Sequence, residues 1–393
     1  MMSSLNIKMT FGVLVAVGFT SSCNEESLPI LTTAPVTNIA ITSATSGGII
    51  NEIGSGPITT VGVCWATKST PTTEDRKTIE SVDSENFTSN LTDLIGGTRY
   101  YVRAYAQNKA GTSYGNEEVF TTQPPISQSG EQIIADHTVV DKYDDIPQYY
   151  LDKVKEMWLV IAGESHSRGY FDGLRLLEEL NSKYAVNWTE SGNPEPFTKT
   201  HLRTSRATWG DLNNETGWIY FYGEEDWWTS PKAIAQTKAG INYCNTNGLA
   251  ISVIGFGHCY DDGVNYADYC AATDEYISFC TSNGYSTKVI FTTNVVDGYS
   301  SLKQYNRSLG ADLIRAHVKA NKDLILFDYA DILCYDDGVD IMNTATYSGH
   351  TFQLITEKNR NPEENYHISK AGAIRLAKAM WWMLARIAGW DGN

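Results

Sequence analysis

A serine follows a short apolar run near the middle of the chain. Residues 158 to 162 are all apolar, and Gly163, Glu164 and Ser165 come directly after them. A hydroxyl at the end of a buried strand can act as a nucleophile, and its amide would lie at a helix start, where the macrodipole favours negative charge. Serine is also a good N-cap residue, so this stretch alone predicts only a strand followed by a capped helix.

A histidine near the C-terminus offers a base for that serine. His367 lies just before a segment whose apolar residues recur at helical spacing, and Glu364 lies three positions before it. Acyl transfer at a serine needs a histidine that takes the hydroxyl proton and an acid that holds the useful tautomer of the histidine. The segment from Gly163 to Ser167 lacks the second glycine of the G-x-S-x-G elbow, which excludes an ordinary α/β-hydrolase.

From about residue 133 strand-like runs alternate with helical segments. Strands are expected at 157–162, 218–222, 250–256, 288–293 and 324–327, and helices at about 168–182, 231–247, 264–283, 301–320 and 369–388. This alternation predicts an α/β three-layer sandwich with a mostly parallel sheet, whose functional residues gather at the carboxyl ends of the strands. The run "LFDYADI" (326–332) is expected to direct Asp328 or Asp331 to the loops there.

The Gly-x-Ser after the first strand and the Glu-x-x-His before the last helix together resemble the SGNH (GDSL-like) hydrolase family, with the resembling domain spanning 133–393. The resemblance implies a flavodoxin-like sheet with Ser165 as nucleophile and His367 as general base. It implies Glu364 as the orienting acid, where the family usually has Asp. We expect neither a metal nor a cofactor.

The middle motifs match that family less closely. Gly210, in "RATWGD", would supply an oxyanion-binding amide. In "GFGHCYDD" (255–262), Gly257 and His258 stand where the family has Asn and Asp. Either His258 or a backbone amide replaces the missing Asn, or the site is impaired, because losing one such donor lowers the rate by about 100- to 1000-fold. His166 is expected either to face the substrate or to be structural.

Aromatic and cysteine residues raise further alternatives. The segment "GEEDWWTSP" (223–231) predicts either a rim on which a sugar stacks or a capped helix with tryptophans in the core. Apart from Cys23, six cysteines occur without the CxxC pairs of a zinc site, and most are expected to be buried free thiols.

Residues 30–122 have the short alternating runs and turn-rich connections of an all-β domain. The stretch "LIGGTRYYVRAYAQNKAGTSYG" (94–115) resembles a fibronectin type III domain, which implies an immunoglobulin-like sandwich with Tyr100 as its corner tyrosine. No catalytic cluster occurs in it, so we expect a spacer or a weak binding module. Residues 123–132, with two prolines, are the expected linker.

The first 23 residues predict a secretory signal. Lys8 precedes an apolar run that is too short to cross a bilayer. The segment "TSSC" (20–23) resembles a bacterial lipobox, and the following "NEE" (24–26) resembles the acidic export signal of Bacteroidetes surface lipoproteins. We expect a lipid anchor at Cys23 and a place on the outer membrane or cell surface. A plain cleaved signal peptide with an incidental cysteine is the alternative.

Composition limits the partners. A net charge of −16 argues against nucleic acid, and 23 Tyr and 10 Trp provide flat faces for sugar rings. The sequence therefore predicts a monomeric cell-surface serine esterase that removes acyl groups, with acetyl the expected one, from a polysaccharide or glycan. The alternative is a catalytically impaired SGNH-like lipoprotein that binds glycans.

Overall fold

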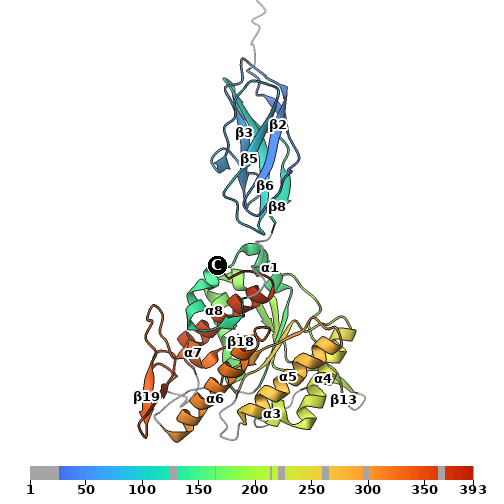
Figure 1. Cartoon of the computed structure of the whole chain (residues 1–393). Coiled ribbons are helices and arrows are strands. Elements are labelled where there is room, and N and C mark those ends of the chain that lie inside the picture. The colour runs from blue at the N-terminus through green and yellow to red at the C-terminus, as the bar shows by residue number, and fades with distance from the viewer. Residues whose placement is uncertain are drawn as a thin grey trace, which may run out of the picture. The chain divides into compact units, whose positions relative to one another are not determined.

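A computed structural model of the chain describes residues 26–123, 131–163, 165–212, 215–219, 226–258, 265–294, 301–361 and 368–392. The chain divides into two compact units, an N-terminal all-β unit and a larger α/β unit (Figure 1). No helix in the described ranges is long and apolar enough to cross a membrane.

The N-terminal unit is an antiparallel β-sandwich, as predicted. Its strands are β1 (Ile30–Thr33), β2 (Ala44–Glu52), β3 (Thr60–Ala66), β4 (Arg76–Lys77), β5 (Asn86–Leu91), β6 (Arg99–Asn108), β7 (Gly111–Tyr114) and β8 (Glu118–Thr121). One sheet has the order β1-β2-β5, and the other has the order β4-β3-β6-β7, with β8 also paired to β6. Leu31, Ile50, Val61 and Ala104 from both sheets form the core. Buried and exposed residues alternate along β1, as expected for strands with one face on a core.

A parallel sheet forms the centre of the α/β unit. Its strands are β9 (Ile134–Ala135), β10 (Trp158–Ala162), β11 (Val186–Trp188), β12 (Leu202–Ser205), β15 (Val253–Phe256), β16 (Lys288–Val289), β17 (Phe291–Thr292) and β18 (Leu326–Phe327). The order is β11-β12-β10-β15-β16 in one part and β17-β18-β9 in the other. Only Ile290 separates β16 from β17, and its N–H donates to the carbonyl of Ile254 in β15 at 2.9 Å. The two parts therefore form one continuous sheet. All pairings are parallel, which confirms the predicted fold class.

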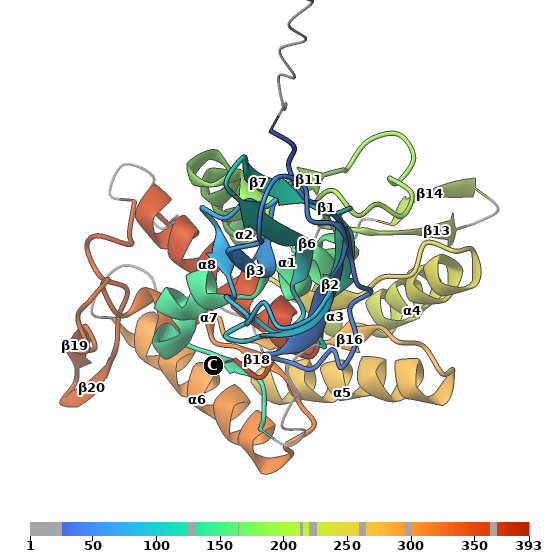
Figure 2. The ribbon, with the colours of Figure 1, turned by 90° about the horizontal axis from the view of Figure 1, so that it is seen from above.

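Helices cover both faces of this sheet. They are η1 (His137–Asp145), α1 (Gln148–Lys155), α2 (Ser165–Leu180), η2 (Ser182–Tyr184), α3 (Asp226–Thr229), α4 (Pro231–Thr246), α5 (Tyr266–Ser282), α6 (Leu302–Ala320), α7 (Tyr329–Leu333) and α8 (Lys370–Ile387). Helices α1, α2 and α8 pack on one face, and α4, α5 and α6 pack on the other (Figures 1 and 2). Ser230, Asn265, Ser301 and Ser369 cap α4, α5, α6 and α8, which is why these helices begin within two residues of the predicted positions.

The sequence predicts that residues 218–222 form a strand of the main sheet. This prediction is wrong for residues 218 and 219, which are the part that the structure describes. Trp218 belongs to β14 (Glu215–Ile219), which pairs with β13 (Thr208–Leu212) in a separate antiparallel hairpin. The strand beside β10 is instead β12, whose sequence "LRTS" has no apolar run. Arg203 in β12 is buried, with its guanidinium 5.7 Å from the ring of Trp158. Packing of this polar strand under a tryptophan was not visible in the sequence. A second hairpin joins β19 (Thr344–Tyr347) to β20 (His350–Gln353).

Candidate active site

The turn that carries Ser165 joins the central strand to a helix. Helix α2 begins at Ser165, shortly after the carboxyl end of β10. Gly163 has a φ of +140°, which a residue with a side chain rarely adopts. The Ala162 carbonyl accepts hydrogen bonds from the Gly257 N–H at 2.7 Å and from the Ser167 hydroxyl at 3.0 Å. These bonds tie the turn to the neighbouring strand β15. Glu164 and the side chain of Ser165 lie outside the described residues.

Glu364 and His367, the expected acid and base, lie outside the described residues, which resume at Ile368. A Cβ added at Gly169 would lie 2.8 Å from Ile368 Cδ1, and one added at Gly173 would overlap the Ala373 carbonyl. Ile368 therefore contacts α2 close to its start, and α8 crosses the same helix one turn further on. The residue that follows His367 thus lies beside the helix that begins with Ser165.

Of the expected oxyanion donors, Gly257 and His258 are hydrogen-bonded to backbone carbonyls, and Gly210 lies in the β13–β14 hairpin. The Gly257 N–H is donated to Ala162, as described above. His258 is buried, and its Nε2 lies 3.2 Å from the Thr292 carbonyl, to which it donates in the tautomer with hydrogen on Nε2. Gly210 lies within the hairpin, where it pairs with Gly217 and packs on α4, rather than at the end of β12. His166 is 3% exposed, so its ring lies inside the domain.

Trp228 lies in the core, which confirms for this residue the prediction that the tryptophans of the segment 223–231 are buried. Its side chain is 1% exposed, its Nε1 donates to Thr273 Oγ1 at 2.9 Å, and its ring stacks on Phe256. The prediction of a sugar-stacking rim is therefore wrong for Trp228. The side chain of Trp227 lies outside the described residues.

A different aromatic residue, not singled out from the sequence, lies beside α2. Trp188 ends β11 and stacks on Phe171 of α2 with ring centroids 5.3 Å apart. The guanidinium of Arg206, which follows β12, lies 5.4 Å from the Trp188 ring and makes a two-bond ion pair with Glu190. Its position at a strand end would have singled out Trp188 if β11 had been recognised.

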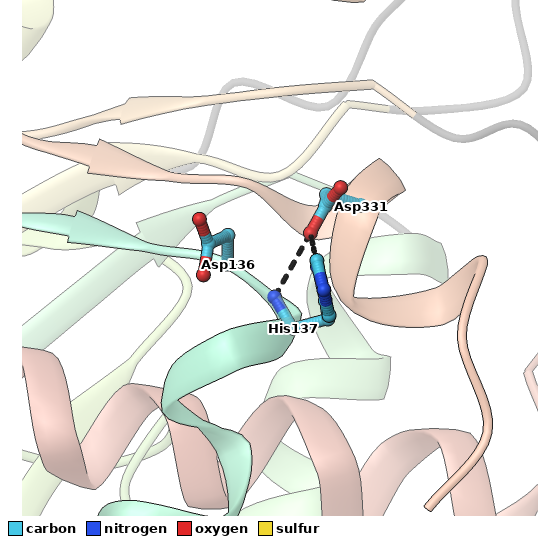
Figure 3. Close-up of side chains that lie close together, drawn as sticks. All are labelled: Asp136, His137 and Asp331. Atoms are coloured by element: carbon cyan, nitrogen blue, oxygen red, sulfur yellow. Dashed lines mark hydrogen bonds and ion pairs between the residues drawn. The ribbon is translucent and has the colours of Figure 1, made fainter. Parts of the chain in front are cut away.

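A histidine–aspartate pair lies at the carboxyl ends of β9 and β18 (Figure 3). His137 Nδ1 lies 2.5 Å from Asp331 Oδ2, and the His137 backbone N–H donates to the same oxygen at 2.9 Å. The ring stacks on Tyr335 with centroids 3.5 Å apart, and its Nε2 lies 3.5 Å from Asp340. No motif surrounds His137, although it follows a short apolar run just as Asp331 does.

The two acids of "LFDYADI" are both engaged within the domain. Asp328 is 4% exposed and accepts two hydrogen bonds from Arg315, at 2.6 and 2.7 Å. Burial, and then the nearby Asp328 carboxylate, raise the pKa of Asp331, while the hydrogen bonds from His137 partly offset that rise. Asp331 is therefore bound to the start of η1 through His137.

Asp136, His137 and Asp331 place three possible metal-ligating atoms within 4.8 Å of one another. One oxygen of Asp331 accepts both bonds from His137, and Asp136 caps η1 by accepting from the Thr138 N–H at 3.0 Å. Hydrogen bonding thus accounts for the arrangement of this group without a cation.

Solved structures that resemble this chain were found, and those described below cover about a quarter of it. No protein-family model and no curated protein matches it. The sensor domain of the anti-sigma factor RsgI4 of Pseudobacteroides cellulosolvens is 16% identical, with 25% of this chain and 97% of that chain covered and a TM-score of 0.20. A fibronectin type III domain of the human KIAA0970 protein is 14% identical (24% and 74% covered, TM-score 0.19), and the chicken CNTN1 FN1–FN3 domains are 13% identical (25% and 32% covered, TM-score 0.20). Each of these matches covers about a quarter of this chain.

Proposed function

We propose that this protein is a cell-surface serine esterase that removes short acyl groups, chiefly acetyl, from a polysaccharide or glycan. Ser165 is the nucleophile, His367 the general base and Glu364 the acid that orients His367. The protein is held at the membrane by lipid on Cys23, and the sandwich unit acts as a spacer. The proposed arrangement of Ser165, His367 and Glu364 resembles that of the SGNH hydrolase family.

The contact of Ile368 with α2 is the observation that carries this proposal. Ser165 starts α2, and Ile368, the neighbour of His367, lies within 2.8 Å of a Cβ built at Gly169. Residues from opposite ends of the α/β unit therefore meet at the carboxyl end of β10. This is the edge where parallel α/β sheets place their ligands.

The chemistry is acyl transfer in two steps. His367 takes the proton of the Ser165 hydroxyl as its oxygen attacks the ester carbonyl, and the tetrahedral intermediate expels the sugar alkoxide, which receives that proton. Water then attacks the acyl-enzyme with His367 again as base, releasing the carboxylic acid and restoring the serine. We assign the oxyanion to the backbone N–H groups at the N-terminus of α2, where the helix macrodipole favours negative charge.

A second candidate function is glycan binding without turnover. It is favoured by the carboxyl end of β15, where the Gly257 N–H and His258 Nε2 both donate to backbone carbonyls. If the first turn of α2 cannot replace these donors, the protein binds acylated glycan and releases it unchanged.

Hydrolysis of p-nitrophenyl acetate and of acetylated polysaccharide tests the two candidates. We expect the wild-type protein to release acetate, and Ser165→Ala and His367→Ala to lower kcat by about 10³-fold or more. Activity that survives both substitutions would exclude this site. Absence of turnover together with retention on an acetylated-glycan column would favour the binding function.

A further inference from the structure

We infer that Ser167 is a positioning residue that holds the nucleophile turn in place. This inference rests on the esterase function proposed above. Ser167 does not touch substrate in this scheme. It acts through the backbone on either side of Ser165.

The Ser167 hydroxyl lies at a junction of three chain segments. Its side chain is 0% exposed, and Oγ donates to the Ala162 carbonyl at 3.0 Å and lies 3.3 Å from the Gly257 carbonyl. Ala162 ends β10, Gly257 follows β15, and Ser167 is in the first turn of α2. The Gly257 N–H donates to the same Ala162 carbonyl at 2.7 Å. One hydroxyl therefore links the helix to the ends of two adjacent strands.

Gly163 and Gly257 leave space for this hydroxyl because neither has a side chain. A Cβ built at Gly163 would overlap Ser167 Oγ, and one built at Gly257 would lie 2.5 Å from the same atom. Gly163 precedes Ser165 by two residues, and Ser167 follows it by two. The backbone of Ser165 is thus held between two points that contact each other.

This clamp sets the direction of the N–H groups at the start of α2. Those groups are the oxyanion donors of the proposed mechanism, because the Gly257 N–H is already donated to Ala162. A catalytic group misplaced by about 1 Å can lower the rate by about 100-fold. Loss of the hydroxyl should therefore slow the chemical step more than it weakens substrate binding.

Ser167→Ala in the full-length protein tests the inference, because alanine fits the same space and favours the helix. We expect kcat on p-nitrophenyl acetate to fall by about 10- to 100-fold with KM changed less than about 2-fold. Amide hydrogen exchange in residues 163–170 should become at least about 10-fold faster. Ser46→Ala is the matched control, because Ser46 is equally buried in the sandwich and donates to the Ala34 carbonyl at 3.0 Å. Ser46→Ala should change neither kcat nor the amide exchange of residues 163–170.

Gly257→Ala disturbs the same junction from the opposite side and serves if Ser167→Ala does not fold. It should produce the same faster exchange in residues 163–170. Unchanged exchange and a kcat within about 2-fold of wild type in either folded variant would overturn the inference. A wild-type protein without any esterase turnover would instead overturn the proposed function, and the exchange measurement would still decide whether Ser167 is the clamp.

Discussion

Buried polar side chains organise the carboxyl edge of the sheet. Asp328 pairs with Arg315, Ser167 joins two strand ends to α2, and His258 binds the backbone of β17. Each of these three side chains has a hydrogen-bonding partner, a donor for the carboxylate and an acceptor for the hydroxyl and the imidazole, as is usual for buried polar groups. Removing one partner leaves the other without its hydrogen bonds in a place that water reaches poorly, which costs more than the bond itself contributes.

Arg315→Ala should destabilise the protein by about 3–5 kcal/mol, because the Asp328 carboxylate would remain buried without its counter-ion. Urea unfolding of the full chain measures this loss. Arg175→Ala is the control, since Arg175 and its partner Glu179 are both more than half exposed. That variant should lose less than about 1 kcal/mol. Equal losses in the two variants would contradict a buried role for Arg315.

The described cysteines should resist thiol reagents at neutral and mildly alkaline pH. All five are buried and free, which confirms the prediction for them: Cys64, Cys244, Cys270, Cys280 and Cys334. Burial raises the pKa of Cys64, Cys244 and Cys280 to about 11 and that of Cys270 to about 12. A thiol with a pKa near 11 is only about 0.1% ionised at pH 8, and the thiolate is the reactive form.

A variant with Cys23→Ser and Cys259→Ser isolates these five thiols. Ellman's reagent should titrate fewer than one thiol per folded chain within minutes at pH 8 and all five in urea. The reaction of the folded protein should speed up as the pH rises toward 11. Rapid modification of several thiols at pH 8 would show that the burial, and with it the packing of α5, is wrong.

At the scale of elements, α2 and α8 cross closely at Gly173 and Ala373. Both helices lie on one face of the sheet, where α8 buries every residue from Leu376 to Ala385 except Lys378. Glycine at position 173 allows the backbones to approach closely, because a Cβ there would overlap the Ala373 carbonyl. The position of Ile368 relative to the first turns of α2 depends on this approach.

Gly173→Ala should therefore lower stability by about 1–3 kcal/mol and also reduce kcat, because the methyl group pushes α8 away from α2. Thermal unfolding and esterase assays measure the two effects. Gly217→Ala is the matched control: nothing lies within 4 Å of a Cβ at Gly217, and its φ is not positive. If Gly173→Ala is as stable and active as the control, the close crossing does not position the site.

At the scale of the whole molecule, the proposed lipid on Cys23 would hold the protein at the membrane. In a bacterial host, Cys23→Ala should shift the protein from the membrane fraction to the soluble fraction and abolish labelling by radioactive palmitate. Cys280→Ser, in α5, should leave both unchanged. Membrane association that persists in the Cys23 variant would contradict the lipid anchor and favour a different attachment.

Local patterns in the sequence determined the elements of this protein and its two-part organisation. The helices are set by apolar periodicity and by serine or asparagine caps, which act within a few residues, so α4, α5, α6 and α8 agree with prediction nearly to the residue. The sandwich, the parallel α/β class and the place of Ser165 after a central strand follow from the same short-range signals.

Only the tertiary structure decided which residues meet. Strand β12 has a polar sequence, yet all four of its residues are buried between β10 and β11, and Arg203 lies against the ring of Trp158, far from it in the chain. The pairing of His137 with Asp331, and the use of the Gly257 N–H by Ala162, likewise depend on which strand ends are neighbours. Hydrogen bonds between distant segments leave no periodic trace in a sequence, since their geometry exists only once the sheet order is set.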